Sequence, residues 1–285
     1  GVYYYWNRDT KELSELILVN PALDPASLSP KQAISYKARD GLDIPAYLTV
    51  PQGADAKNLP MVVLPHGGPH ARDFKEYDYW VQFLVNRGYA VLQPNFRGST
   101  GYSGAFQAAG RQNWGLLMQD DVTDGVKAMV DQGIANPDRI CIVGGSYGGY
   151  AALMGAVKTP DLYKCAASIN GVTSLSSLIR SDKKFIGGDV WTQSIGDIGG
   201  DIKKLLETSP AERADEIKIP VLLIQFEDDL RVPERQANLM VDAMEDADVK
   251  HTYLQFEKGG HELVTKEARL KVLTALEVFL AENLK

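Results

Sequence analysis

The stretch ICIVGGSYGGYAALMGAV, residues 140–157, decides how this chain folds. Its first part is an apolar run typical of a strand buried on both faces, and its last part continues directly as an apolar helix. Gly144, Ser146 and Gly148 occupy every second position of the turn between the expected strand and the expected helix. In such a Gly-x-Ser-x-Gly turn, larger side chains two positions before or after the serine would clash. The pattern therefore predicts a strained turn with Ser146 at its tip.

A glycine-rich turn can also hold a serine that has no chemical role. The motif occurs by chance in many sequences, but here a strand precedes it and a helix follows it, which is the context that a nucleophile elbow requires. The N-terminus of the following helix would also stabilise negative charge that develops beside the serine. We therefore favour the interpretation of Ser146 as a nucleophile.

Apolar runs and helical patterns alternate on both sides of this motif. The expected strands are 61–67, 89–95, 139–145, 164–170, 219–226 and 251–256. The expected helices are roughly 76–87, 115–132, 147–158, 234–246 and 262–283. Short apolar strands separated by amphipathic helices are typical of a parallel sheet covered on both faces. Together with the serine turn, they predict an α/β-hydrolase fold over residues 31–285, with a mostly parallel, doubly wound sheet.

Residues 1–30 differ in character from this domain. Two strand-like runs, VYYYW and LSELILV, flank a polar turn, and the Pro- and Ser-rich stretch NPALDPASLSP follows as a linker. A lone hairpin is only marginally stable in water, so we expect this piece to come from a larger sheet or to lean on the domain. Further on, Asp40-Gly41 predicts a hairpin turn. The Ser-, Gly- and Asp-rich excursion between Gly171 and Pro210 is expected to cover the ligand crevice.

The order of residues in this fold restricts the choice of general base. The acid and then the histidine follow the serine, each at the carboxyl end of a later strand. Only His251 and His261 follow Ser146. His251 opens a strand at its amino end, so we interpret it as structural. His261 follows the far end of that strand, in the loop EKGGHEL, and is the candidate base, although an ordinary helix start would look similar.

Three carboxylates, Glu227, Asp228 and Asp229, follow the expected strand at 219–226. A buried carboxylate that accepts a hydrogen bond from imidazole fixes the tautomer of the ring and stabilises the imidazolium. Position alone does not separate Asp228 from Asp229 as the source of this carboxylate.

A tetrahedral intermediate also requires preorganised N–H donors. The backbone N–H of Tyr147, directly after the serine, is the expected first donor. The His-Gly-Gly turn after the strand at 61–67 offers a second, for which we choose Gly68. His66 precedes Ser146 in the chain, so we expect it to shape this turn rather than to act as a base.

Composition excludes several other classes of protein. The chain has 285 residues, 45% of them hydrophobic, and a formal charge of −7, which argues against a nucleic-acid partner. No apolar run approaches the roughly 18 residues of a membrane span. The N-terminus does not have the pattern of a signal peptide, and the sequence indicates no particular cellular compartment. Cys141 and Cys165 lie in apolar runs, and we expect buried free thiols rather than a disulfide or a metal site. No dinucleotide fingerprint is present, so no cofactor is expected.

The sequence resembles the catalytic domain of the prolyl oligopeptidase family, in particular its acylaminoacyl-peptidase and dipeptidyl-peptidase-like bacterial members. The resemblance spans roughly residue 32 to the C-terminus and is carried by residues 66–106, 118–155 and 159–172. In that family the acid stands three residues before a valine, which implies Asp229, and the histidine stands in a Gly-rich loop, which implies His261.

Two departures from the family pattern matter. The family usually has His-Gly where this chain has Gln225-Phe226, and this change is expected to alter the packing of the acid loop. Family members also usually carry a long N-terminal β-propeller that filters substrates by size. This chain is too short to contain one, so the resemblance implies that residues 1–30 are a propeller remnant with its linker, attached to an isolated catalytic portion.

The resemblance implies hydrolysis of peptide or acylated amino-acid bonds through a Ser146–Asp229–His261 triad and an acyl-enzyme. A carboxylesterase acting on short acyl esters is the alternative. A non-catalytic binding module of the same fold is a third hypothesis, which the complete set of serine, acid and histidine in the required order disfavours. A small peptide or acyl ester is therefore the expected partner, and the sequence is compatible with a homo-oligomer.

Two further groups of residues are candidates for substrate contacts. Phe185 and Trp191 could line an acyl or side-chain pocket, although ordinary packing of the excursion would also explain them. Arg97 and Asp120-Asp121 could anchor a substrate, but we favour a structural ion pair near the sheet.

Overall fold

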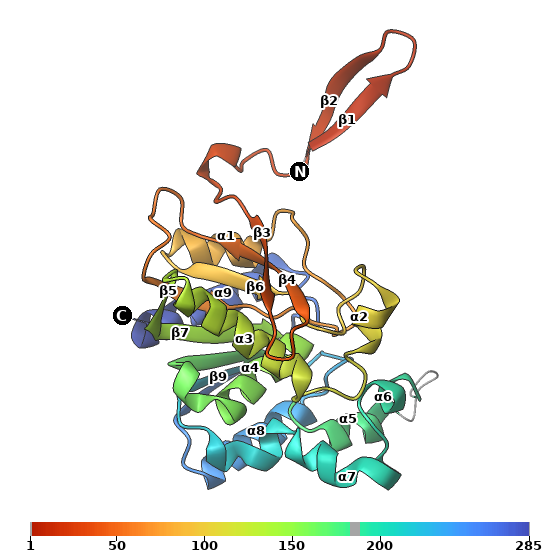
Figure 1. Ribbon diagram of the computed structural model, residues 1–285, viewed down its shortest axis with the longest axis vertical. Coiled ribbons are helices and arrows are strands. Elements are labelled where there is room, and N and C mark those ends of the chain that lie inside the picture. The colour runs from red at the N-terminus through yellow and green to blue at the C-terminus, as the bar shows by residue number, and fades with distance from the viewer. Residues whose placement is uncertain (1, 183–188, 285) are drawn as a thin grey trace.

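The computed structural model describes residues 2–182 and 189–284. Its centre is an eight-stranded sheet in the order β10-β9-β8-β7-β5-β6-β4-β3 (Figure 1). The strands are β3 (Gln32–Lys37), β4 (Asp43–Thr49), β5 (Leu59–Val63), β6 (Ala90–Pro94), β7 (Ala135–Gly145), β8 (Cys165–Ile169), β9 (Val221–Phe226) and β10 (His251–Phe256). β4 pairs antiparallel with β3 and with β6, and all other neighbours pair parallel. The expected mostly parallel sheet and the hairpin at Asp40-Gly41 are confirmed.

Helices connect these strands and cover the sheet. They are α1 (Tyr79–Asn86), α2 (Gly104–Ala108), α3 (Leu117–Asp131), α4 (Tyr147–Lys158), α5 (Leu175–Asp182), α6 (Asp189–Ser194), α7 (Ile198–Glu207), α8 (Arg235–Asp246) and α9 (Lys266–Asn283). Within the described parts of the chain, no helix combines the length and apolar character needed to cross a bilayer.

Successive residues of the central strands face two different hydrophobic cores. In β7, Ile140 and Ile142 join the core that α3, α4 and α8 cover, whereas Cys141 and Val143 join the core under α1 and α9. All four side chains are fully buried. A strand that is apolar at every position is therefore buried on both faces, which confirms the doubly wound arrangement.

Two of the differences between the structure and the expected elements lie close to the expected site. α9 begins at Lys266 rather than near residue 262, and this leaves His261 in a loop. Where the structure describes it, the excursion after β8 contains three helices, α5, α6 and α7. Ser, Gly and Asp interrupt the apolar pattern there, so the sequence did not indicate these helices, but α7 still buries Leu205 against the larger core.

Cys141 and Cys165 form a disulfide bond, so the expectation of two free thiols is wrong. The two residues lie opposite each other on the parallel neighbours β7 and β8, with Cα atoms 4.8 Å apart. An apolar context predicts burial of each cysteine separately, and both are buried. Their pairing depends on which strands are neighbours in the sheet, which the local sequence around each cysteine does not reveal.

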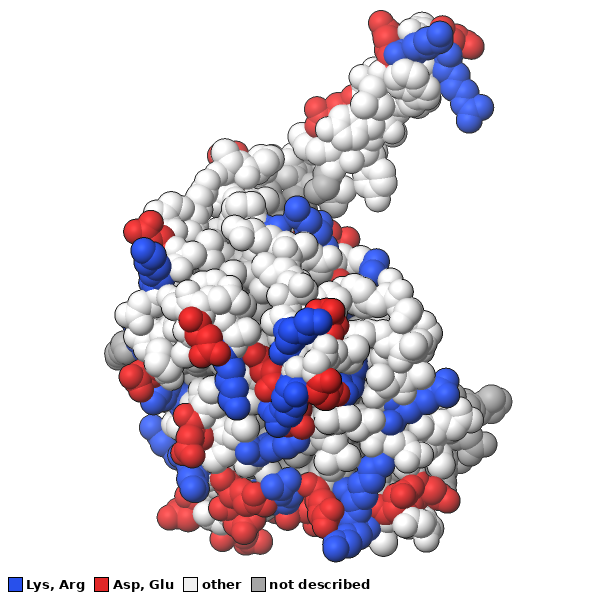
Figure 2. Space-filling model, in the orientation of Figure 1, with Lys and Arg blue, Asp and Glu red and all other residues white. Residues whose placement is uncertain are grey.

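β1 (Val2–Asn7) and β2 (Glu12–Leu18) form an antiparallel hairpin that is separate from the eight-stranded sheet. It projects away from the body of the molecule (Figure 1), and its charged side chains gather mainly at the outer turn (Figure 2). Tyr3 and Leu16 are each 63% exposed, and the other apolar side chains of the hairpin are also exposed. The hairpin therefore leaves an apolar surface open to solvent.

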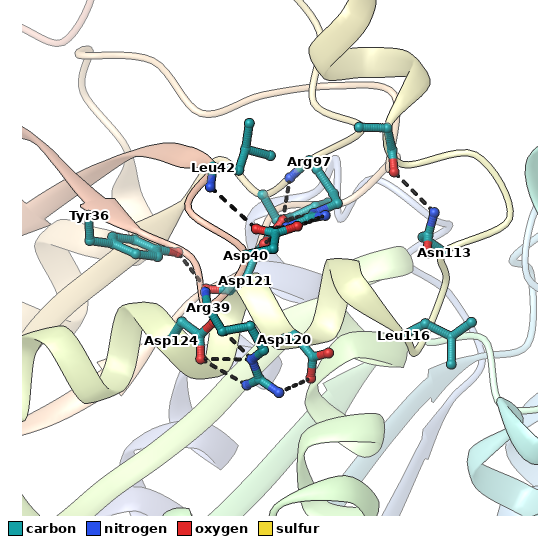
Figure 3. Close-up of polar contacts among 12 residues, drawn as sticks. Tyr36, Arg39, Asp40, Leu42, Arg97, Asn113, Leu116, Asp120, Asp121 and Asp124 are labelled. Carbon is teal, nitrogen blue, oxygen red and sulfur yellow. Dashed lines mark hydrogen bonds and ion pairs between the residues drawn. The ribbon is translucent and has the colours of Figure 1, made fainter.

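A buried ion pair lies where the loop after β6 meets α3 (Figure 3). Arg97 donates from Nε and Nη2 to the two carboxylate oxygens of Asp121, over 2.8 and 2.7 Å. Its Nη1 lies 2.8 Å from Asp40 in the turn between β3 and β4. Asp120 instead pairs with Arg39 and Lys158. The expected structural ion pair is thus present between Arg97 and Asp121, and it joins a hairpin, a loop and a helix.

We expect Asp121→Ala to lower the free energy of unfolding by up to about 3–5 kcal/mol, because the buried charge of Arg97 would keep only the partly exposed Asp40 as a partner. Asp43→Ala, which removes the exposed partner of Lys37, should cost less than about 1 kcal/mol. Urea unfolding of both variants measures the difference. Equal losses of unfolding free energy would show that the buried ion pair does not stabilise the fold more than an exposed one.

Candidate active site

Ser146 lies in the sharp turn between β7 and α4. Its φ and ψ angles are 58° and −123°, a combination that a non-glycine residue rarely adopts and that costs on the order of 1–3 kcal/mol. Its backbone N–H donates to the carbonyl oxygen of Ile169, at the end of β8, over 3.0 Å. The turn is thus fixed to the neighbouring strand.

The glycines on either side of Ser146 are needed because the chain nearly touches itself. A Cβ atom added to Gly144 would lie 2.3 Å from the backbone of Gly148. A Cβ atom added to Gly148 would lie 2.2 Å from the carbonyl oxygen of Pro65, which follows β5. The elbow therefore packs against itself and against the adjacent strand-end loop.

His261 lies in the loop between β10 and α9, and its Nδ1 is 2.7 Å from Oδ2 of Asp229. Since a carboxylate only accepts hydrogen bonds, Nδ1 carries the proton and Nε2 of the neutral ring is left as an acceptor. Asp229 is 3% exposed, and its Oδ1 accepts from the backbone N–H groups of Arg231 and Val232 over 2.8 and 2.9 Å. The structure places Asp229, and not Asp228, against the imidazole.

The turn that carries Ser146 and the loop that carries His261 both line a cavity of about 660 Å³. Ser146, Tyr147 and His261 line it, as do Gly67 and Gly68 of the His-Gly-Gly turn. The described part of the chain therefore unites the predicted nucleophile, the predicted base and the predicted oxyanion donors around one space.

The His-Gly-Gly turn lies against the elbow. A Cβ atom added to Gly67 would be 3.5 Å from Cβ of Ser146, and Gly68 has a φ of +119°, which favours glycine. His66 stacks on Phe96 with ring centroids 4.4 Å apart, and its Nε2 is 2.9 Å from Oγ of Ser99. Burial lowers the pKa of His66 to about 4. A neutral His66 in these contacts fits the expected role of shaping the turn.

The predicted substrate residues are only partly described. Trp191 lines the cavity and packs edge-on against Trp114, which itself packs edge-on against Tyr147. Phe185 lies outside the described residues. His251 begins β10, at the amino end of the strand, and its Nδ1 is 2.8 Å from the carbonyl oxygen of Val249. This is the position that we interpreted as structural.

Asp73, Asp78 and Gln93 also line the cavity, and sequence analysis did not identify them. Asp78 caps α1 by accepting from the N–H of Trp80 over 2.9 Å and also accepts from Nε2 of Gln93 over 3.1 Å. Oδ2 of Asp73 is buried without a hydrogen-bond partner. Burial, reinforced by the charge of Asp78, raises the pKa of Asp73 to about 7. An aspartate before a helix signals a cap, but no pattern indicates the environment of Asp73.

Among residues 2–182 and 189–284, no group of three or more His, Cys, Asp or Glu side chains is arranged to hold a metal ion.

The sheet, its two-sided core and the serine turn at the end of β7 define an α/β-hydrolase fold. A family model described as the prolyl oligopeptidase family matches residues 75–285. The chain belongs to this family, as the resemblance implied.

Individual relatives agree with this assignment. The chain is 38% identical over 294 residues to dipeptidyl aminopeptidase BIII of Pseudoxanthomonas mexicana, covering 99% of this chain and 43% of the relative. A puromycin-hydrolyzing peptidase of Mycobacterium tuberculosis superimposes with a TM-score of 0.88 at 30% identity, covering 99% and 43% of the two chains. An acylaminoacyl peptidase in complex with Z-Gly-Gly-Phe-chloromethyl ketone has a TM-score of 0.88 at 26% identity, covering 99% and 46%. The chain thus spans less than half the length of these relatives.

Asp73 leads to a prediction about stability and pH. Its pKa is raised on folding, so the folded state binds a proton more tightly than the unfolded state between about pH 4 and pH 7. Its contribution to stability is therefore present at low pH and is lost as the pH rises toward 7. Compared with wild type, Asp73→Asn should gain on the order of 2 kcal/mol in unfolding free energy between pH 5 and pH 8.

Urea unfolding at the two pH values measures this gain. Asp138→Asn, which alters a side chain that is 84% exposed, is the matched control and should show no such gain. The same offset from wild type at both pH values in Asp73→Asn would contradict the prediction.

Proposed function

We propose that this chain is the catalytic part of a serine peptidase that cleaves peptide or acyl-amino-acid bonds. The observation that carries the proposal is the 2.7 Å contact between His261 and the buried Asp229, in a cavity that the strained Ser146 also lines. A nucleophile, a base and an orienting carboxylate are the three parts of nucleophilic acyl transfer.

In the proposed reaction, Oγ of Ser146 attacks the substrate carbonyl carbon while Nε2 of His261 takes the hydroxyl proton. The resulting oxyanion would accept hydrogen bonds from the backbone N–H groups of Tyr147 and Gly68. Collapse of the intermediate breaks the bond to the leaving group, which receives the proton from His261, and leaves an acyl-serine. His261 then takes a proton from a water molecule, which attacks the acyl-serine and releases the carboxylic acid product and free Ser146. Asp229 holds the imidazole throughout and stabilises its protonated form.

The substrate class is proposed from the relatives and from the cavity. The named relatives are a dipeptidyl aminopeptidase and peptidases, one of them in complex with a peptidyl chloromethyl ketone. Val172, Leu178 and Trp191 contribute apolar side chains to the cavity lining, which suits a substrate side chain. The role proposed for Phe185 in this pocket rests on the sequence alone.

We expect this chain to hydrolyse the p-nitroanilides of acetyl-alanine or of an alanyl dipeptide, as well as p-nitrophenyl butyrate. Ser146→Ala should lower turnover of every substrate by about 10⁴-fold or more, because no other group supplies the nucleophile. Release of nitroaniline or nitrophenol gives the rates, and Ser14→Ala, on the exposed strand β2, is the matched control.

The two substrate classes separate the hypotheses. Ester turnover without anilide turnover would replace the peptidase assignment with a carboxylesterase. Turnover that survives in Ser146→Ala would exclude Ser146 as the nucleophile, and no turnover of any substrate by the wild-type chain would reject the proposal for this chain.

Asp229→Asn should lower kcat by on the order of 10³–10⁴-fold, since an amide in this place favours the wrong imidazole tautomer. The fold should persist, because the amide oxygen can still accept from the backbone N–H groups of Arg231 and Val232. Asp246→Asn, at the exposed end of α8, is the control. Comparison of kcat and thermal unfolding for both variants tests the prediction, and a loss of less than tenfold in Asp229→Asn would contradict it.

We further propose that residues 1–30 are a hairpin and linker that belong with a second sheet, such as the propeller of the family. The exposed apolar side chains on both strands of the hairpin support this association, as does the 43% coverage of the dipeptidyl aminopeptidase relative. Substrate selection by size would depend on such additional protein.

A further inference from the structure

The loop that carries His261 lies between β10 and α9 and contains no helix or strand. The contact with Asp229 orients the imidazole ring, but it does not by itself fix the backbone from which the ring projects. Gly259 and Gly260 precede His261 directly, and Gly260 has a φ of +62°. A pair of glycines is conformationally permissive, so this backbone needs contacts of its own to hold one position.

Asp228 supplies such contacts. Its Oδ1 accepts from the backbone N–H of Gly259 over 3.0 Å and from that of Gly260 over 2.7 Å, and its Oδ2 lies 3.2 Å from the same nitrogen of Gly259. A carboxylate that accepts from backbone N–H groups forms charge-assisted hydrogen bonds, which are stronger than neutral ones. These bonds, with the one to Gly260 contributing most, hold the pKa of Asp228 below its usual value.

The loop is also held from its other side. Nδ2 of Asn170 donates to the carbonyl oxygen of Gly260 over 3.1 Å, and Oδ1 of Asn170 accepts from the N–H of Phe226 over 2.9 Å. The ring of Phe226 packs so closely on Gly259 that an added Cβ atom would lie 2.1 Å from it. The backbone of Gly260 is therefore held on both sides, by Asp228 at its N–H and by Asn170 at its carbonyl oxygen, beside the ring of Phe226.

The two adjacent aspartates point in different directions. Asp229 is buried and contacts the imidazole of His261. Asp228 is exposed and contacts Gly259 and Gly260, the two residues before His261. The loop after β9 thus contacts both the ring of His261 and the backbone of the two glycines that precede it.

We propose that Asp228 is a positioning residue, which holds the Gly259-Gly260 backbone so that His261 reaches Ser146 in a reactive geometry. This inference rests on the proposed function, because it requires His261 to be the general base. Catalysis by a base is sensitive to small displacements, and a shift of about 1 Å can cost on the order of 10²-fold in rate. Asp228 touches neither the substrate nor a reacting atom in this proposal.

Three variants test the proposal, with kcat and KM measured for p-nitrophenyl butyrate. Asp228→Ala removes the acceptors and should lower kcat about tenfold while KM stays within about twofold, because substrate contacts are unchanged. Asp228→Asn keeps Oδ1, the atom that accepts from both glycines, and should recover kcat to within about threefold of wild type. Glu257→Ala removes an exposed carboxylate from the same loop and should leave kcat unchanged.

Thermal unfolding of each variant verifies that it is folded at the assay temperature. If Asp228→Ala does not give folded protein, Asp228→Gln replaces it, since the additional methylene displaces the acceptor and should give the same fall in kcat. The labelling rate of Ser146 with a fluorophosphonate is a second readout, and it should fall with kcat because it also needs the base.

The outcomes separate this inference from the proposed function. Wild-type turnover that Ser146→Ala abolishes, together with an Asp228→Ala kcat equal to that of Glu257→Ala, would overturn the inference alone. An Asp228→Asn variant as slow as Asp228→Ala would also overturn it, because the charge would then matter rather than the hydrogen bonds. Absence of wild-type turnover would reject the proposed function and this inference with it.

Discussion

The close approach of Gly144 and Gly148 is the constraint on which the rest of the structure depends. Because the chain passes within contact distance of itself there, β7 can run straight into α4, and Ser146 is placed at the carboxyl end of the sheet. The carbonyl oxygen of Pro65 lies against Gly148, so the loop after β5 must pass beside the serine. Parallel strands place their following loops at the same edge, which brings the loops after β9 and β10 to this point as well. The site is thus a consequence of one tight turn in a parallel sheet.

Much of this arrangement could be predicted from the sequence because its causes are local or follow from chain order. The all-apolar runs predicted buried strands, and Asp40-Gly41 predicted its hairpin. Only His251 and His261 follow the serine, so chain order reduced the choice of a base to two residues. The distinction between Asp228 and Asp229 needed the family resemblance, because two adjacent carboxylates have the same local pattern. The structure places the second of them against the imidazole.

The features that the sequence did not predict depend on neighbours that are distant along the chain. The contacts of the altered pair Gln225-Phe226 are one example, since the sequence predicted a change in the packing of the acid loop but not the partners of these two residues. Nε2 of Gln225 donates to the carbonyl oxygens of Phe226 and Val232 and so closes the acid loop, while Phe226 packs on Gly259. The perturbed carboxyl of Asp73 is another, since its pKa reflects burial and the nearby Asp78 rather than any motif. Sequence patterns predict which segments are buried, but not which side chains meet within them.

The disulfide between Cys141 and Cys165 has a consequence for the chemistry of the unfolded chain. The two cysteines are 24 positions apart and enclose the nucleophile turn and all of α4 in one covalent ring. Lys158 and Lys164 also lie within this ring. A protease that cuts after these lysines would therefore open the ring without separating its two halves. A reagent attached to Ser146 would be recovered on a peptide that stays joined to the segment containing Cys165 until the sulfurs are reduced.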